Sequence, residues 1–184
     1  MLEDKQRWNE KYKTMAQSEK ASSVLQRHLE MINVGRALDI ACGKGRNSYL
    51  LADYGFLVDA VDYSDYALAQ IRDIESINKI DTDLDMYEIP LDSYDLIVNI
   101  NYLDRRFFTQ IKEGLKQNGV IVFETFVMTE DEHHTQLKNV KYLLRENELL
   151  DAFRDLHILY YEERDEVNKD GEKIRIASLV ARKV

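Results

Sequence analysis

The fold is decided by one stretch of sequence, Leu38-Asp39-Ile40-Ala41-Cys42-Gly43-Lys44-Gly45-Arg46-Asn47-Ser48. The apolar run at 36–40 predicts a short buried strand, the two glycines predict a turn, and residues 47–54 predict a helix. Gly43 and Gly45 allow positive φ angles and a close approach of the backbone to a ligand. Because the following helix presents free N–H groups, the stretch predicts a ligand site at the carboxyl end of a parallel strand.

Outward from this stretch, strand and helix patterns alternate along the chain. Two amphipathic helices come first, one with Trp8, Tyr12 and Met15 at helical spacing and one over residues 24–32. Further strands are predicted at 56–61, 76–80, 94–100, 120–123, 157–164 and 173–183, and further helices at 64–74, 103–115 and 145–153. The turn Asn168-Lys169-Asp170-Gly171 joins the last two strands as a hairpin.

This alternation predicts an α/β, Rossmann-like fold. We expect a seven-stranded, mostly parallel sheet with helices on both faces and an antiparallel C-terminal β-hairpin. The chain of 184 residues has the length of one domain, and it contains one proline, seven glycines and no linker-like segment. Residues 1–184 are therefore predicted to form a single domain.

Composition and charge narrow the class of protein. The chain has 34 acidic and 25 basic residues, for a formal net charge of -9, and it shows no basic cluster of the kind that holds nucleic acid. No apolar run has the length of a membrane span, and the first ten residues hold no apolar stretch for a signal peptide. With Cys42 as the single cysteine, we expect a soluble, cytoplasmic protein without disulfides, membrane contact or nucleic-acid partner.

Two nucleotide cofactors compete for the glycine turn. The dinucleotide pattern needs a third glycine, and Ser48 stands at that position. Asp62, at the end of the second strand, could accept the ribose hydroxyls of either cofactor. Asp39 would repel a pyrophosphate and attract a cationic amino acid group, which favours a cationic cofactor. An NAD-dependent oxidoreductase stays open as the alternative.

Several segments together resemble class I S-adenosylmethionine-dependent methyltransferases. Ala-Leu-Asp-Ile-Ala-Cys-Gly-Lys-Gly at 37–45 is similar to the first motif of that superfamily, and the segments at 58–64, 83–84, 94–98 and 117–126 are similar to the motifs that follow it. Within the superfamily, residues 102–106, 143–150 and the closing Ala-Ser-Leu-Val-Ala-Arg-Lys look closest to the small tellurite-resistance-type and type 11 methyltransferases. The resemblance spans about residues 7–183.

The resemblance implies a set of cofactor contacts. The methionine part would lie against Asp39, Ala41, Gly43 and Gly45, and the ribose against Asp62, with residues 1–33 packing as helices over this side. The remaining implied contacts are Tyr63 and Leu84 beside the adenine, Asp83 at its amino group and Asn99 near the sulfonium.

Two positions depart from the pattern of the family. Ala41 and Asn118 each replace a usual glycine, and the Ala41 methyl is tolerable if its φ stays negative.

The acceptor is less defined than the cofactor. We predict methyl transfer to a small soluble molecule such as a thiol or a metalloid oxyanion, which would need no strong general base. Tyr102, Arg105 and Arg106 are the candidates for positioning it as catalytic residues, although Arg105 and Arg106 could equally begin a solvated helix or pair with Asp104. A cofactor-binding module without turnover is a second alternative. A monomer and a homodimer are both compatible with the sequence.

Four other features have competing interpretations. The acids at 81–85 resemble the start of a calcium loop but lack its glycine and glutamate, so we predict no metal site. His133 and His134 are expected to be an exposed pair, with a part in catalysis left open. Cys42 is expected to be a packing residue rather than a reactive thiol. Trp8 and Tyr12 serve either as core anchors or as part of a lid.

Overall fold

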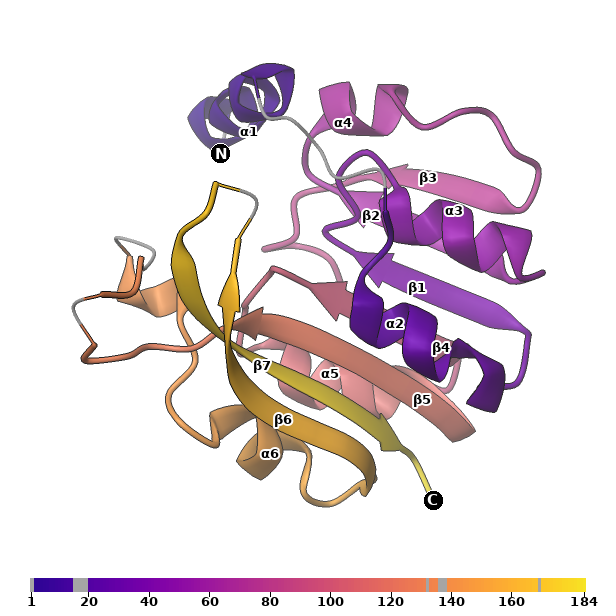
Figure 1. The fold of residues 1–184 in the computed structure, drawn as a ribbon. Helices are drawn as coiled ribbons and strands as arrows, with labels where there is room; N and C mark the ends of the chain where they lie inside the picture. The colour runs from indigo at the N-terminus through magenta and orange to yellow at the C-terminus, as the bar shows by residue number, and fades with distance from the viewer. Residues whose placement is uncertain (1, 15–19, 132, 136–138, 169) are drawn as a thin grey trace.

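The computed structural model describes residues 2–14, 20–131, 133–135, 139–168 and 170–184, with the side chains of 2–4 left aside. Met15 and Lys169 lie outside the described residues. Seven strands form one sheet in the order β3-β2-β1-β4-β5-β7-β6 (Figure 1). The strands are β1 Arg36–Ile40, β2 Leu57–Asp62, β3 Ile77–Asp81, β4 Tyr94–Ile100, β5 Leu115–Phe126, β6 His157–Val167 and β7 Lys173–Arg182. The predicted fold class is therefore confirmed.

The sheet is parallel except at its C-terminal strands. β1 pairs in parallel with both β2 and β4, whereas β7 runs antiparallel to β5 and to β6. The strand order thus reverses beside β1, and in open α/β sheets ligands bind at the carboxyl ends of the strands at such a reversal. The glycine turn at 41–45 follows β1 at this point.

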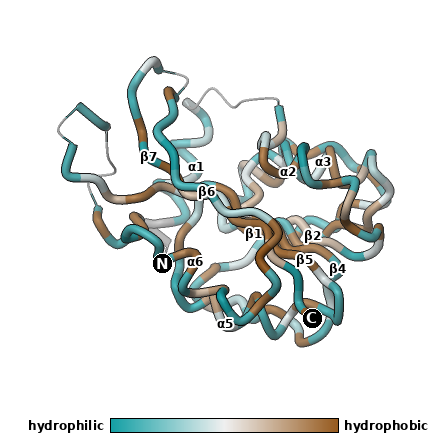
Figure 2. The backbone as a smooth tube through the Cα atoms, turned by 60° about the horizontal axis from the view of Figure 1, so that its bottom comes forward, coloured by the Kyte–Doolittle hydropathy of each residue, from teal (hydrophilic) through white to brown (hydrophobic). Residues whose placement is uncertain are grey.

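Helices cover both faces of the sheet. They are α1 Leu2–Thr14, α2 Ser23–His28, α3 Arg46–Asp53, α4 Asp65–Ala69, α5 Phe107–Gly114 and α6 Glu148–Phe153, with short 3-10 turns at Leu29–Met31 and Val140–Tyr142. Figure 1 shows α2 and α3 on one side of the sheet and α5 on the other. Alternate side chains of the strands enter two buried apolar clusters, one with α2, α3 and α4 and one with α5 and α6. Figure 2 shows the central strands as the most hydrophobic part of the chain.

The boundary between α5 and β5 differs from the prediction. The apolar spacing predicted a helix over 103–115 and a strand over 120–123, but α5 ends at Gly114 and β5 begins at Leu115. Leu115 pairs with Tyr94 of β4, and a Cβ on Gly114 would lie 2.4 Å from Ile89 Cγ2. Tertiary contacts of this kind override helical periodicity. The same periodicity predicted a helix over 64–74, whereas α4 ends at Ala69.

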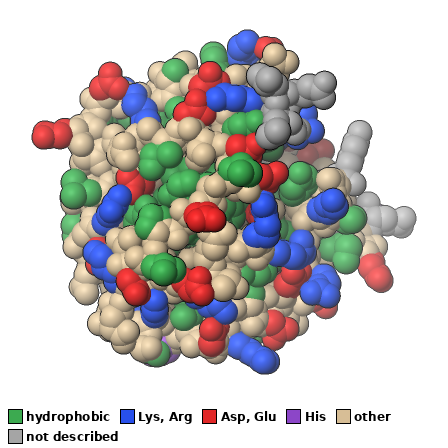
Figure 3. All heavy atoms as spheres, turned by 180° about the vertical axis from the view of Figure 1, so that it is seen from behind, with side chains coloured by type: hydrophobic (Ala, Val, Ile, Leu, Met, Phe, Trp, Pro, Cys, Tyr) green, Lys and Arg blue, Asp and Glu red, His purple; other side chains and the backbone are tan. Residues whose placement is uncertain are grey.

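The surface carries mixed charge. On the face seen in Figure 3, acidic and basic side chains are interspersed. Among the residues that the structure describes, no helix combines the length and the apolar character that crossing a membrane requires.

Candidate functional site

The glycine turn is held rigidly at the end of β1. The Cys42 N–H donates to the Val61 carbonyl of β2 at 3.0 Å, and the Gly45 N–H donates to the Cys42 carbonyl at 3.0 Å. Gly43 and Gly45 have φ angles of 56° and 80°, in the left-handed region that favours glycine. A Cβ on Gly43 would lie 3.0 Å from the Tyr12 hydroxyl, so the turn also needs a glycine for close packing.

Ala41 contradicts the expectation of a negative φ. Its φ is 53°, which places a residue with a Cβ in the left-handed region at the start of the turn. Such a conformation costs an alanine about 1–2 kcal/mol relative to glycine. Asn118 also has a positive φ, of 67°, but asparagine tolerates this region better.

Asp62 links the two segments that follow β1 and β2. Its carboxylate accepts the Gly43 N–H at 2.8 Å through one oxygen and the Ser64 N–H at 2.8 Å through the other. The Tyr12 hydroxyl lies close by and also favours the charged form of this carboxylate. Burial raises the pKa of the Asp62 carboxyl, and the hydrogen bonds oppose that rise. The side chain is thus fixed at the mouth of the glycine turn, and its ribose-binding role stays a prediction.

Asp39 is a second buried carboxylate beside the turn. It is 1% exposed, and the Ser48 hydroxyl donates to it at 2.6 Å. Burial raises the pKa of Asp39 to about 7, although the Ser48 hydrogen bond acts in the opposite direction. Ser48 occupies the third-glycine position of a dinucleotide turn, so this pair places a carboxylate where a pyrophosphate would have to lie.

Helix α1 lies over these acids and is held there by polar contacts. Lys5 binds the Asp81 carboxylate at the end of β3 at 2.7 Å. Asn9 accepts from the Ser64 hydroxyl at 2.6 Å and donates to Asp65 at 2.8 Å. Together with the Tyr12 contact to Asp62, these bonds favour a lid over a core anchor for the N-terminal helix.

The structure places the other predicted cofactor residues at the same edge of the sheet. Tyr63 follows β2 and is half-buried, with the Lys5 ammonium 5.7 Å from its ring centroid. Asp83 follows β3 and accepts the Asp85 N–H at 3.0 Å, and Leu84 is buried. Asn99 is buried near the end of β4, beside Ile40 of β1, and donates to the Tyr102 carbonyl at 2.7 Å.

The predicted catalytic arginines have carboxylate partners. Arg105 forms a two-pronged pair with Glu148 of α6 at 2.5 and 2.9 Å and donates to the Lys141 and Leu143 carbonyls. Arg106 pairs with Asp104 and, at 2.6 Å, with Asp85. These contacts favour the Asp104 ion-pair alternative for Arg106, whereas Arg105 pairs with Glu148, a partner that the sequence analysis did not predict.

Tyr102, the third of these candidates, has a half-buried side chain. Burial raises the pKa of its hydroxyl well above the usual value, so it remains a neutral hydrogen-bonding group.

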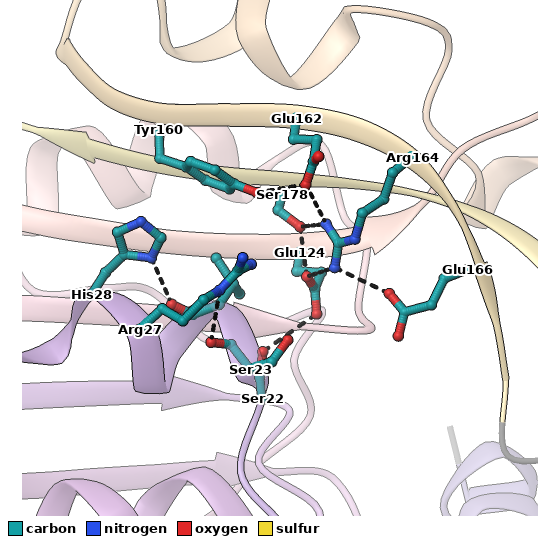
Figure 4. A network of polar contacts seen from close by, with 11 residues as sticks. Ser22, Ser23, Arg27, His28, Glu124, Tyr160, Glu162, Arg164, Glu166 and Ser178 are labelled. Carbon is teal, nitrogen blue, oxygen red and sulfur yellow. Dashed lines mark hydrogen bonds and ion pairs between the residues drawn. The ribbon is translucent and has the colours of Figure 1, made fainter.

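A buried polar network beside α2 was missed at the sequence level (Figure 4). Arg164 of β6 reaches Glu124 of β5 at 3.2 Å and the Ser178 hydroxyl of β7 at 2.7 Å. Ser178 donates to Glu124 at 2.5 Å, and Ser22 donates to it at 3.3 Å. A single acid in the apolar run of β5 is the signal that could have pointed to this network.

The two neighbouring histidines differ in their exposure to solvent. His133 is exposed, as predicted, but the His134 side chain is only 3% exposed, so the expectation of two exposed histidines is wrong for His134. It is buried because the segment after β5 lies against the C-terminal hairpin, where the Thr135 N–H donates to the Lys173 carbonyl at 2.8 Å.

Cys42 agrees with its simpler interpretation. It is buried, and burial raises the pKa of its thiol well above the usual value, as expected for a packing residue rather than a reactive thiol. Within the described ranges no group of three or more His, Cys, Asp or Glu side chains could hold a metal ion. The absence of a metal site at 81–85 stays a prediction.

The arrangement suits a ligand with a positive charge and a ribose. Two buried acids, Asp39 and Asp62, flank the glycine turn at the reversal of strand order. A positively charged group on the ligand offsets the cost of charging a buried carboxylate. The two neighbouring hydroxyls of a ribose can both donate hydrogen bonds to a carboxylate.

Comparison with known proteins agrees with this geometry. The chain is 26% identical over 170 residues to the probable S-adenosyl-L-methionine-dependent methyltransferase TehB of Haemophilus influenzae, covering 84% of this chain and 59% of that protein. It is 24% identical over 132 residues to the tRNA U34 carboxymethyltransferase of Mannheimia succiniciproducens, covering 65% of this chain and 41% of that protein. The crystal structure of Haemophilus influenzae TehB superposes with a TM-score of 0.73 at 23% identity, covering 98% of this chain and 67% of that one.

The chain thus spans well under two thirds of the length of these curated relatives. A family model described as "Tellurite resistance protein TehB" matches residues 1–179, and the chain belongs to the TehB family.

Proposed function

We propose that the protein transfers a methyl group from S-adenosylmethionine to a small molecule. The observation that carries this proposal is the pair of buried acids, Asp39 and Asp62, on either side of the glycine turn at the reversal of strand order. The cofactor, when bound, supplies a methyl group made electrophilic by a sulfonium. Family membership supports the same reaction.

The residues present fit this cofactor. Asp62 lies at the mouth of the turn with both oxygens already oriented by backbone N–H groups, as a bidentate acceptor for ribose hydroxyls requires. Asp39 is a buried carboxylate whose pKa is raised to about 7, so a nearby ammonium group would stabilise its charged form. Asp62 would suit the ribose of NAD as well, but Asp39 would not suit NAD, because its carboxylate would repel the pyrophosphate.

The protein contributes position and exclusion of water to the reaction. The turn and β4 fix the backbone around the cofactor, and α1 covers Asp62 through Tyr12. The Tyr12 hydroxyl holds the place on Asp62 that a ribose hydroxyl would take. Cofactor binding therefore requires Tyr12 to move aside, and α1 then closes the site from water.

The acceptor is proposed to be a small molecule rather than a nucleic acid. The chain carries a net charge of -9, which opposes binding to a polyphosphate, although one relative is named as acting on tRNA. A metalloid oxyanion at Arg105 or Arg106 would have to displace Glu148 or Asp104, which favours a thiol as the acceptor. A cytoplasmic location and a monomeric or homodimeric state stay predictions.

Calorimetry with S-adenosylhomocysteine and with NAD tests the proposal. We expect the wild type to bind S-adenosylhomocysteine and not NAD, and Asp62→Ala to weaken binding about 100-fold through loss of charge-assisted hydrogen bonds. Asp53→Ala, which removes an exposed acid at the end of α3, is the matched control. Tight NAD binding without S-adenosylhomocysteine binding would overturn the proposal.

Turnover needs a separate measurement. Mass spectrometry of thiols, selenite, tellurite and metabolite extracts incubated with labelled cofactor should find a methylated product. A protein that binds S-adenosylhomocysteine yet yields none across these mixtures would be a cofactor-binding module.

A further inference from the structure

The segment that follows β3 bears Asp83 and Leu84, two of the residues expected beside the adenine, and it is only lightly packed against the rest of the fold. Of residues 81–88, all of which the structure describes, only Leu84 is buried. A cavity of about 260 Å³ lies between this segment and the start of α5. Atoms that line a cavity lack packing contacts on that side, so packing alone fixes the segment weakly.

Arg106, just before α5, contacts this segment from the other side of the cavity. Its Nη2 donates to the Asp85 carboxylate at 2.6 Å, and its Nη1 donates to the Asp85 carbonyl at 3.1 Å. The Asp85 N–H in turn donates to the Asp83 carboxylate at 3.0 Å. Arg106 therefore holds both the side chain and the backbone of the residue that follows Leu84 and that orients the Asp83 carboxylate.

The Arg106 guanidinium is itself fixed by Asp104, whose side chain is 16% exposed. Its Nε lies 3.1 and 3.0 Å from the two carboxylate oxygens of Asp104, and the Arg106 backbone N–H donates to one of them at 3.0 Å. An ion pair near the surface contributes more within such a network than alone. Because most of its N–H donors are used in these bonds, Arg106 is better suited to holding this segment than to binding an anionic acceptor.

We infer that Arg106 is a positioning residue for the cofactor, because it holds Asp83 and Leu84 in place for the adenine. This inference rests on the proposed function, since it concerns the adenosine half of S-adenosylmethionine. Loss of Arg106 should weaken the binding of that half and leave the contacts of the methionine half, around Asp39 and the glycine turn, as they are.

Calorimetry with S-adenosylhomocysteine and with 5′-methylthioadenosine, which keeps the adenosine but lacks the amino acid, separates the two halves. We expect Arg106→Ala to weaken the binding of both ligands by the same factor, about fivefold. Asp39→Asn should instead weaken S-adenosylhomocysteine more than 5′-methylthioadenosine, because only the former carries an ammonium group. Arg154→Ala, which removes an exposed arginine after α6, is the matched control and should leave both affinities unchanged.

The variant Asp85→Asn tests whether Arg106 acts through Asp85. It should weaken both ligands in the same direction as Arg106→Ala, and the double variant should bind no more weakly than Arg106→Ala alone. Asp85 has a side chain that is 76% exposed, so its variant decides the question if Arg106→Ala fails to fold.

Hydrogen exchange in the free protein measures the position of the segment without the cofactor. The N–H groups of Asp85 and Met86 both donate to Asp83, and they should exchange about threefold faster in Arg106→Ala than in the wild type. The N–H groups of the glycine turn at 41–45 should exchange at the same rate in both proteins.

The outcomes distinguish this inference from the proposed function. If the wild type binds neither ligand, both fail. If the wild type binds both ligands and Arg106→Ala binds them equally well, or loses affinity for S-adenosylhomocysteine alone, the inference fails and the proposed function stands. Exchange rates at Asp85 and Met86 that do not change in Arg106→Ala would also overturn the inference.

Discussion

At the residue scale, the backbone of the first turn carries strain that the family pattern avoids. Ala41 has a φ of 53° although it bears a Cβ, and Asn118 has a φ of 67° before the apolar part of β5. Both stand where the resembling family has glycine. The chain therefore keeps the backbone conformation of the pattern while losing the residue type that adopts it most easily.

Replacing Ala41 by glycine should stabilise the protein. Relief of the left-handed strain outweighs the greater freedom of glycine in the unfolded chain, so the free energy of unfolding should rise by about 1 kcal/mol. Urea denaturation measures this change. Asn118→Gly is the control and should change stability by about half as much or less, because asparagine tolerates positive φ. A lower stability of Ala41→Gly would show that the Ala41 methyl makes a packing contact that matters more than strain.

Asp39 should make stability depend on pH in the acid range. Its pKa is raised to about 7 by burial, so its folded form favours the protonated state. The stability that this group contributes is fully present below its unfolded pKa of about 4 and is lost as pH rises through 7, by up to about 1.4 kcal/mol per pH unit. Urea denaturation from pH 4.5 to 8 should show a larger loss in the wild type than in Asp39→Asn, because Asp62, whose pKa is also raised, remains in both proteins. Parallel curves for the two proteins would contradict the assignment.

At the scale of elements, α1 is held by polar bonds along its length rather than by core packing. Lys5, Asn9 and Tyr12 each contact an acid or a hydroxyl at the carboxyl edge of β2, β3 or the start of α4. Polar contacts to partly exposed groups are individually weak, which suits an element that must move when a ligand enters.

The variant Tyr12→Phe tests whether the Tyr12 hydroxyl competes with a ribose hydroxyl of the cofactor for Asp62. Removing the hydroxyl leaves Asp62 with a free acceptor position, so S-adenosylhomocysteine should bind about threefold to tenfold more tightly. Tyr54→Phe, at an exposed position, should have no effect. Weaker binding by Tyr12→Phe in calorimetry would mean that the hydroxyl contacts the cofactor instead of competing with it.

Arg105, just before α5, binds Glu148 of α6 and two backbone carbonyls of the segment before α6. Arg105→Ala removes the charged donor of the buried Glu148 carboxylate, which keeps the Arg145 N–H, and the donor of two carbonyls, so the free energy of unfolding should fall by about 2 kcal/mol. Arg154→Ala, at an exposed position after α6, is the control. If Arg105 instead positions the acceptor, stability will be unchanged and the kcat or KM of methyl transfer will change.

At the scale of the whole molecule, the net charge predicts weak binding to tRNA. The net charge is -9, and acidic and basic side chains are interspersed on the face seen in Figure 3. Filter binding of unmodified tRNA at about 150 mM salt should therefore give no specific retention, because binding depends on neutralising phosphates. A micromolar affinity that falls steeply with salt would show a basic surface that the net charge conceals.

The sequence by itself determined the order of elements and the cofactor side of the site. Asp39, Gly43, Gly45 and Asp62 could be placed from local pattern, since a parallel strand, a glycine turn and an acid after the next strand impose their own geometry. The resemblance added Asp83 and Asn99, which the structure places at the same edge.

Only the tertiary structure decided which partners the other charged side chains have and which of them are buried. Arg105 meets Glu148 from 43 residues away, and Arg164 meets Glu124 from 40 residues away. His134 is buried by a hairpin that follows it in sequence. Local patterns report periodicity and turn chemistry over a few residues, whereas the partner of a charge and its burial depend on which distant strands become neighbours.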